Sequence, residues 1–241
     1  MIKITKENIF EEAKKGNLDV LDHPNVSLSL DTILFLRTPL HFLAWEGKIE
    51  VLNHKDVSVV KDMSGGTPLH FLADVGKVEV LNHKDVSIVK DVEGWTPLHF
   101  LARAGKVEVL NHKDVSIVKD VEGWTPLHIL ANKGQIAVLK HPSVDKVMDT
   151  KGRTPLHFLA DMWGRFEVLE HPSVDLVKDL EGNTPLEDLY KYWANHNLNL
   201  EIVQEWVLKK YSWFKLKEKM TPQILKKILN TPNSAKFILN I

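Results

Sequence analysis

The sequence contains no cysteine among its 241 residues. Disulfide bonds, thiolate catalysis and cysteine-based zinc sites are therefore excluded. It also lacks an apolar run long enough to span a membrane, and its N-terminus has no basic, apolar and small-residue pattern typical of a secretory signal. We therefore expect a soluble cytoplasmic protein, acting in its own cell or delivered into a host.

The chain also has almost no excess of charge of either sign, with a formal net charge of −1. This balance hides an asymmetry along the chain. Residues 207–241 hold eight lysines and one glutamate, a local charge of +7 that leaves −8 for the rest of the chain. The sequence thus predicts an acidic body with a basic C-terminal end.

The main feature of the sequence is a recurring seven-residue motif, called the phrase below. Thr-Pro-Leu-His-Phe-Leu-Ala begins at Thr38, Thr67, Thr96 and Thr154, and a copy with Ile in place of Phe begins at Thr125. The step between successive copies is 29 residues, and a degraded sixth copy begins one residue late, at Thr184. A fixed period of this length indicates a solenoid, in which each unit buries its apolar face against its neighbours.

Each part of the phrase has a role in a helix. Threonine is a preferred N-cap, and proline fits the first helical position because its missing N–H is not needed there. The apolar residues that follow predict a short helix, and a glycine after the alanine ends it. A second short helix is expected over Lys-Val-Glu-Val-Leu-Asn-His, and Asp-Val-Ser-Ile-Val-Lys-Asp is expected to run extended into a glycine-containing turn.

With these motifs in register, residues 5–190 resemble the ankyrin-repeat family. The matching elements are Gly-x-Thr-Pro-Leu-His, Ala-x-x-Gly, the Val-Glu-Val helix and Asp-Val-Ser. Ankyrin repeats usually run 33 residues, so each unit here is about four residues short, or about one helical turn. The resemblance implies an outer helix shortened by that turn.

The predicted fold class is all-α, an ankyrin-repeat solenoid of about seven units with a C-terminal helical cap region. Residues 1–190 form the array, with a polar N-terminal cap unit that keeps only Ala-x-x-Gly, followed by six repeats. Residues 191–241 form a basic helical region, because residues 198–217 have helical spacing and two Thr-Pro pairs open further helices.

The 12 histidines suggest a metal site at first sight. All but His196 recur once per unit, however, which spreads them along the array, whereas the ligands of one metal must converge on a point. No nucleophile, carboxylate pair or phosphate-binding loop stands out. We therefore predict no metal, no cofactor and no catalytic activity.

The variable positions of the repeat are the candidate binding residues. In the ankyrin family these positions line a concave protein-binding face, so the resemblance implies contact residues before Thr-Pro and between Ala and Gly. Tryptophan and arginine, which are enriched at binding hot spots, occupy most of them. The predicted contact residues are Arg37, Trp45, Trp95, Arg103, Trp124, Arg153 and Trp163, together with Phe35 in the first turn.

Two of these assignments have alternatives. Trp95 and Trp124 could instead stack on neighbouring turns as part of the array. Phe35 belongs to the apolar segment 33–36, which either projects as a contact site or folds back over the N-terminal unit.

The leading functional hypothesis is a non-enzymatic scaffold that binds a protein target through its concave face and turn tips, as an inhibitor or effector. In the alternative, the repeats target a C-terminal module that contacts nucleic acid or an anionic membrane. Its contact residues would be Lys209, Lys210, Trp213 and Lys215. The identity of the target and the oligomeric state stay open.

Overall fold

The computed structural model describes residues 3–31 and 35–196. The chain divides into two compact units, residues 1–129 and residues 130–241. Every regular element in the described residues is a helix, apart from one isolated antiparallel bridge between Asp31 and Arg37. The all-α fold class and the regular repetition of paired helices are therefore confirmed.

Two kinds of helix alternate along the described chain. The α-helices are α1 (Ile9–Lys14), α2 (Pro39–Trp45), α3 (Pro68–Asp74), α4 (Pro97–Arg103), α5 (Pro126–Asn132), α6 (Pro155–Trp163) and α7 (Pro185–Asn195). The 3₁₀-helices are η1 (Leu18–Asp22), η2 (Ile49–Asn53), η3 (Val78–Asn82), η4 (Val107–Asn111), η5 (Ile136–Lys140) and η6 (Phe166–Glu170).

The helix boundaries follow the recurring phrase. In α3, Thr67 is the N-cap, Pro68 is the first helical residue and His70 completes a capping box. Gly76 follows the helix with a φ of 79°, in the left-handed region that glycine adopts without strain, and its N–H donates to the carbonyl of Ala73. The assigned positions of threonine as N-cap, proline as first helical residue and glycine at the helix end are thus confirmed.

The second helix of each unit differs from the expected α-helix. It is a five-residue 3₁₀-helix, as in η3, with a valine (Val80) as its fully buried residue. A helix this short closes only a few hydrogen bonds, and tighter winding is common in such pieces. The segment that follows was expected to be extended, and this is wrong for its first part. The backbone N–H groups of Val86 and Ile88 donate to the carbonyls of His83 and Asp85, each three residues earlier, in consecutive turns.

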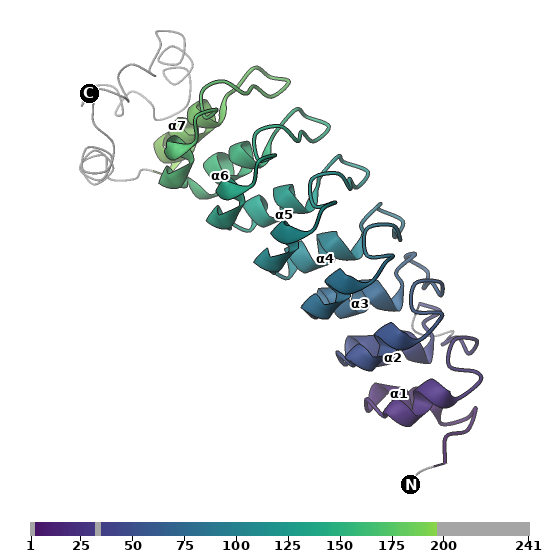
Figure 1. The fold of residues 1–241 in the computed structure, drawn as a ribbon. Coiled ribbons are helices and arrows are strands. Elements are labelled where there is room, and N and C mark those ends of the chain that lie inside the picture. The colour runs from purple at the N-terminus through teal and green to yellow at the C-terminus, as the bar shows by residue number, and fades with distance from the viewer. Residues whose placement is uncertain (1–2, 32–34, 197–241) are drawn as a thin grey trace. The chain divides into compact units, whose positions relative to one another are not determined.

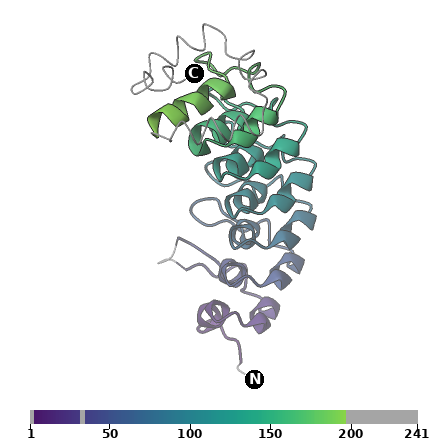
Figure 2. The same ribbon diagram turned by 90° about the vertical axis from the view of Figure 1, so that its left-hand side faces the viewer.

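In the first unit, α1 to α4 pack side by side in chain order (Figure 1). The 3₁₀-helices form a second column beside the α-helices, as the rotated view shows (Figure 2). The core between them comes from the phrase itself, since Leu98, Leu101 and Ala102 of α4 are fully buried, as are their counterparts in α2 and α3. Repetition of one phrase therefore builds a continuous apolar core.

In the second unit, α6 packs against α7. The indole N–H of Trp193 donates to the carbonyl of Gly164 at 3.3 Å, and its ring lies 4.7 Å from that of Phe166. Tyr190 is buried beside it. Aromatic side chains therefore pack α7 against the segment that follows α6. The predicted boundary at residue 190 falls inside α7, and most of residues 191–241 lie outside the described chain.

Serine–aspartate hydrogen bonds link neighbouring repeats within each unit. In the first unit, the hydroxyl of Ser87 donates to the carboxylate of Asp114 at 2.7 Å, and Ser58 donates to Asp85 at 2.6 Å. In the second unit the direction is reversed, because Ser173 donates back to Asp145 of the preceding repeat at 2.6 Å. The reversal matches the sequence, where Asp-Val-Ser changes to Ser-Val-Asp.

Candidate functional site

The histidine of each phrase connects its repeat to the next. The Nδ1 atom of His70 accepts a hydrogen bond from the backbone N–H of Thr67 at 3.0 Å, and its Nε2 atom lies 3.0 Å from the carbonyl oxygen of Trp95. His41, His99 and His157 make the same bridge to the following turn. The predicted structural role of these histidines is therefore confirmed for these four.

This geometry fixes the proton on the ring. Because Nδ1 accepts from an N–H, only Nε2 carries a hydrogen, and Nε2 donates to the carbonyl. Burial lowers the pKa of His41, His70 and His99 to about 4, so these rings stay neutral near pH 7. Both nitrogens are engaged, and these imidazoles are not free to act as acids or bases.

The turn aspartates hold the tips of the hairpins. Asp62 Oδ1 accepts from the backbone N–H of Ser64 and of Gly66, both at 2.9 Å. Asp91 and Asp120 make the same two bonds in the next turns. One carboxylate oxygen of each aspartate therefore fixes its own turn, and the other oxygen is left for a neighbour.

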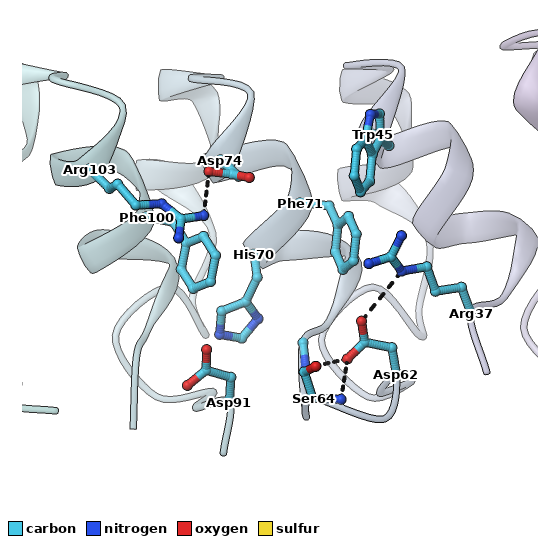
Figure 3. A pocket seen from close by; sticks show the side chains of 11 residues that line it. Arg37, Trp45, Asp62, Ser64, His70, Phe71, Asp74, Asp91, Phe100 and Arg103 are labelled. Carbon is cyan, nitrogen blue, oxygen red and sulfur yellow. Dashed lines mark hydrogen bonds and ion pairs between the residues drawn. The ribbon is translucent and has the colours of Figure 1, made fainter. Parts of the chain in front are cut away.

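A pocket of about 250 Å³ opens on the face formed by α2, α3, α4 and their turns. Phe71 and Phe100 stand on either side of His70, with Asp62 and Asp91 at the turns (Figure 3). The lining residues are Arg37, Trp45, Asp62, Ser64, Gly66, His70, Phe71, Asp74, Asp91, Phe100 and Arg103. Three of the predicted contact residues, Arg37, Trp45 and Arg103, are thus brought to one site.

Arg37 forms the centre of an aromatic cluster at one end of the pocket. Its guanidinium carbon lies 4.8 Å from the ring centre of Phe71, 5.0 Å from Trp45 and 5.4 Å from Phe35. Its Nε atom is 3.5 Å from Asp62 Oδ2. Trp45 itself is 53% exposed, so this cluster presents an indole ring to solvent.

Arg103 forms the corresponding cluster at the other end. Its guanidinium carbon lies 4.5 Å from the ring centre of Phe100 and 5.4 Å from Trp95. It also pairs with Asp74 of the preceding repeat at 2.6 Å (Figure 3). A carboxylate from the neighbouring helix therefore holds the guanidinium over these rings.

No family model matches the sequence, and a search of curated proteins finds no match either. What the site does must therefore be inferred from its own residues.

The other predicted contact residues of the first unit lie outside the pocket lining. Trp95 is half-buried, and its ring packs against His99 and Phe100. Trp124 is half-buried, and its backbone N–H donates to Asp120 while its carbonyl accepts from His99. Phe35 is 57% exposed and has a φ of 63°, a left-handed conformation that is costly for a bulky residue.

In the second unit, Arg153 and Trp163 are each fixed by nearby groups. Arg153 binds Asp149 Oδ2 through Nε at 3.0 Å and Nη2 at 2.9 Å. The indole N–H of Trp163 donates to the carbonyl of Asn132 at 2.8 Å. The predicted anionic-partner residues Lys209, Lys210, Trp213 and Lys215 lie outside the described residues, and their role stays a prediction.

Sequence reasoning missed the phenylalanines and aspartates of the pocket. Phe71 and Phe100 belong to the phrase and were taken as helix core, yet both are half-buried. The helical spacing was the available signal, since they precede the fully buried leucines by one position and so point about 100° away. A column of exposed aliphatic side chains was missed too, with Val59, Ile88 and Ile117 all 66–68% exposed.

The described residues contain no group of three or more histidine, aspartate or glutamate side chains placed to hold a metal ion. None of their helices is both long enough and apolar enough to cross a membrane.

Proposed function

We propose that this chain is an ankyrin-type repeat scaffold without catalytic activity, which binds a protein target through the face that carries the pocket. The ankyrin assignment rests on the phrase and on what each of its residues does. The threonine caps, the proline starts the helix, the histidine bridges to the next turn and the glycine ends the helix. The short 3₁₀-helix takes the place of the family's longer outer helix.

One observation carries the binding proposal. Arginine and tryptophan side chains occur where the repeat is otherwise nearly constant, and two such clusters meet at one pocket instead of being scattered. Trp45 and the side chain of Arg103 (43% exposed) remain accessible. Such a partly exposed arrangement of tryptophan, arginine and phenylalanine is typical of the centre of a protein interface.

The proposed mechanism is steric. A target bound along this face has its own surface covered, and no group of the pocket needs to react. An inhibitor or effector function would follow from which surface of the target is covered.

Affinity capture with purified protein as bait identifies the target, and variants then test the face. Trp45→Ala with Arg103→Ala removes one residue of each cluster. The dissociation constant for the captured target should rise about 30-fold, the usual result of truncating a hot spot. Both side chains are about half exposed, so the circular dichroism spectrum should not change.

Glu79→Ala with Glu108→Ala is the matched control, because both glutamates are exposed on the 3₁₀-helices η3 and η4, away from the pocket. This variant should bind like the wild type. Equal binding by both double variants would show that the pocket face is not the binding surface.

A further inference from the structure

The Asp91 carboxylate has an unused oxygen at the pocket. Its Oδ1 accepts from the N–H of Glu93 at 3.0 Å and of Trp95 at 2.8 Å, which completes the turn. Among the described residues, Oδ2 has no hydrogen-bond or ion-pair partner. Burial also raises the pKa of Asp91, although Arg103 acts to lower it.

The equivalent oxygen has an arginine partner in the turns of Asp62 and Asp149, whereas the turn of Asp120, like that of Asp91, carries a tryptophan instead. Oδ2 of Asp149 receives two hydrogen bonds from Arg153, and Oδ2 of Asp62 pairs with Arg37. The turn of Asp91 carries Trp95 at the position of Arg153, and that ring packs on His99 and Phe100 instead. In this fold a guanidinium is therefore the partner of the second carboxylate oxygen where one is present, and Asp91 Oδ2 lacks such a partner.

The charges around the pocket also leave a negative balance. Arg37 pairs with Asp62, and Arg103 pairs with Asp74. Asp91 remains as the lining carboxylate without such a pair among the described residues. Two cations and three anions give a local charge of −1, which a single cation from outside would neutralise.

The walls of the pocket suit a flat cation. Phe71 and Phe100 flank the opening above His70 (Figure 3), and each already has an arginine of this chain against its ring. Arginine stacks on aromatic faces and donates two hydrogen bonds in one plane to a carboxylate. The volume of about 250 Å³ is below the roughly 300–1,000 Å³ of sites for whole drug-sized molecules. It is suited to one side chain.

We propose that this pocket receives an arginine side chain of the protein target, stacked between Phe71 and Phe100 and hydrogen-bonded to Asp91 Oδ2. This inference rests on the proposed protein-binding function and specifies the chemistry of the target. The target would present an accessible arginine, with the rest of its contact surface meeting Trp45 and the exposed edge of Arg103.

The probe for the test is N-acetyl-arginine amide, titrated into ¹⁵N-labelled full-length protein and followed by NMR. The shifts of backbone amides in segments 64–71 and 91–95 should saturate with a dissociation constant on the order of 10 mM, a weak affinity appropriate to one side chain. N-acetyl-citrulline amide has nearly the same shape without the charge, and at matched ionic strength it should produce no saturable shift.

Asp91→Asn tests the assigned oxygen. The asparagine Oδ1 still accepts from Glu93 and Trp95, so the turn is kept while the charge is lost. Affinity for N-acetyl-arginine amide should fall at least about tenfold. Asp120→Asn is the matched control, because Asp120 makes the same two turn bonds but does not line the pocket. It should bind the probe like the wild type.

Absence of saturable shifts in the wild type, equal shifts with citrulline, or unchanged affinity in Asp91→Asn would each overturn the arginine inference. The two proposals fail separately. If the arginine probe does not bind but Trp45→Ala with Arg103→Ala still weakens target binding about 30-fold, the pocket face binds protein by other chemistry. If the probe binds as expected while target binding is unaffected by those variants, only the proposed function fails.

Discussion

At the residue scale, the recurring histidine is distinguished by having both an acceptor and a donor. It caps its own helix through Nδ1 and reaches the next turn through Nε2. In α7 this position holds Glu187, which accepts from the backbone N–H of Thr184 at 2.7 Å. A carboxylate can only accept, and the described chain has no further turn after α7 for it to reach. Histidine is therefore needed where a following turn must be bridged.

Replacing His99 by Glu tests this division of roles. The glutamate can still cap Thr96, but it leaves the carbonyl of Trp124 without its donor and buries a charge. We expect a loss of about 1–3 kcal/mol in the free energy of unfolding at pH 7.5, measured by urea denaturation. His99→Gln, which offers an acceptor and a donor, should lose clearly less. Equal losses for the two variants would contradict the bridging role.

The serine–aspartate pairs make a second prediction at this scale. Ser87→Asp alone places a carboxylate against Asp114, and Asp114→Ser alone leaves two hydroxyls facing each other. Each should cost about 1 kcal/mol, the aspartate variant more. The double variant restores a donor and an acceptor in reversed order, as Ser173 and Asp145 already have. Its stability should return to within about 0.5 kcal/mol of wild type in the same urea assay. A double variant as unstable as the sum of the singles would refute this interchangeability.

At the element scale, none of the helices in the described residues is long enough to be stable alone. Most of the α-helices have seven residues and the 3₁₀-helices have five, far below the roughly 12 to 15 residues that an isolated helix needs. Their stability comes from the caps at each end and from the fully buried leucines between neighbouring repeats. The two contributions are of different size and can be separated by mutation.

Thr96→Ala removes the hydroxyl of an N-cap and should cost roughly 1 kcal/mol in the free energy of unfolding. Leu98→Ala leaves a cavity at a fully buried position and should cost about 2–5 kcal/mol. Chemical denaturation of both variants beside the wild type gives the comparison. Equal costs would mean that cap and core have been assigned wrongly.

The helices α2 to α6 could be predicted from sequence almost to the residue, because each begins at a Thr-Pro pair and ends shortly before a glycine, and both signals are local. The end of α7 could not, because no glycine follows it. The winding of the second helix could not be predicted, since its five residues carry no signal that separates 3₁₀ from α. The pocket was predicted only in part. Arg37, Trp45 and Arg103 stood out as unusual residues in a constant frame, whereas Phe71, Phe100 and Asp91 look like ordinary members of the repeat until the helix faces are known.

At the scale of the whole molecule, packing contacts within each unit join α-helices that follow one another in the chain, as between α2 and α3 or between α6 and α7. In such an arrangement stability is close to a sum over repeats and their neighbouring contacts. The effect on stability of a residue that recurs from repeat to repeat therefore adds up along the chain. The buried, neutral histidine is such a residue.

Acidification should therefore destabilise the protein steeply between about pH 6.5 and pH 4. In this range His41, His70 and His99 stay neutral when folded, because their pKa values are about 4, and take up protons on unfolding. Asp188 acts in the opposite direction, since burial raises its folded pKa to about 7 and it releases a proton on unfolding. For these four groups together, the balance near pH 5 is an uptake of about two protons on unfolding. Stability should fall by about 3 kcal/mol per pH unit, measured by urea melts at several pH values.

His99→Gln provides the control for this slope. Glutamine does not titrate, so the variant should take up about one proton fewer near pH 5. An unchanged slope would show that the buried histidines are not the groups that link stability to pH.

The reversal of the serine–aspartate pairs has a consequence for how the chain can gain or lose repeats over generations. A repeat copied in tandem brings its own serine and aspartate in the order of its parent, so every new junction is matched from the start. Recombination that joins a repeat of one order to a repeat of the other sets two like groups against each other. Growth by copying neighbours is therefore favoured over shuffling. The stretches 76–102 and 105–131, which differ only at Phe100 and Ile129, are the kind of pair that such copying leaves behind.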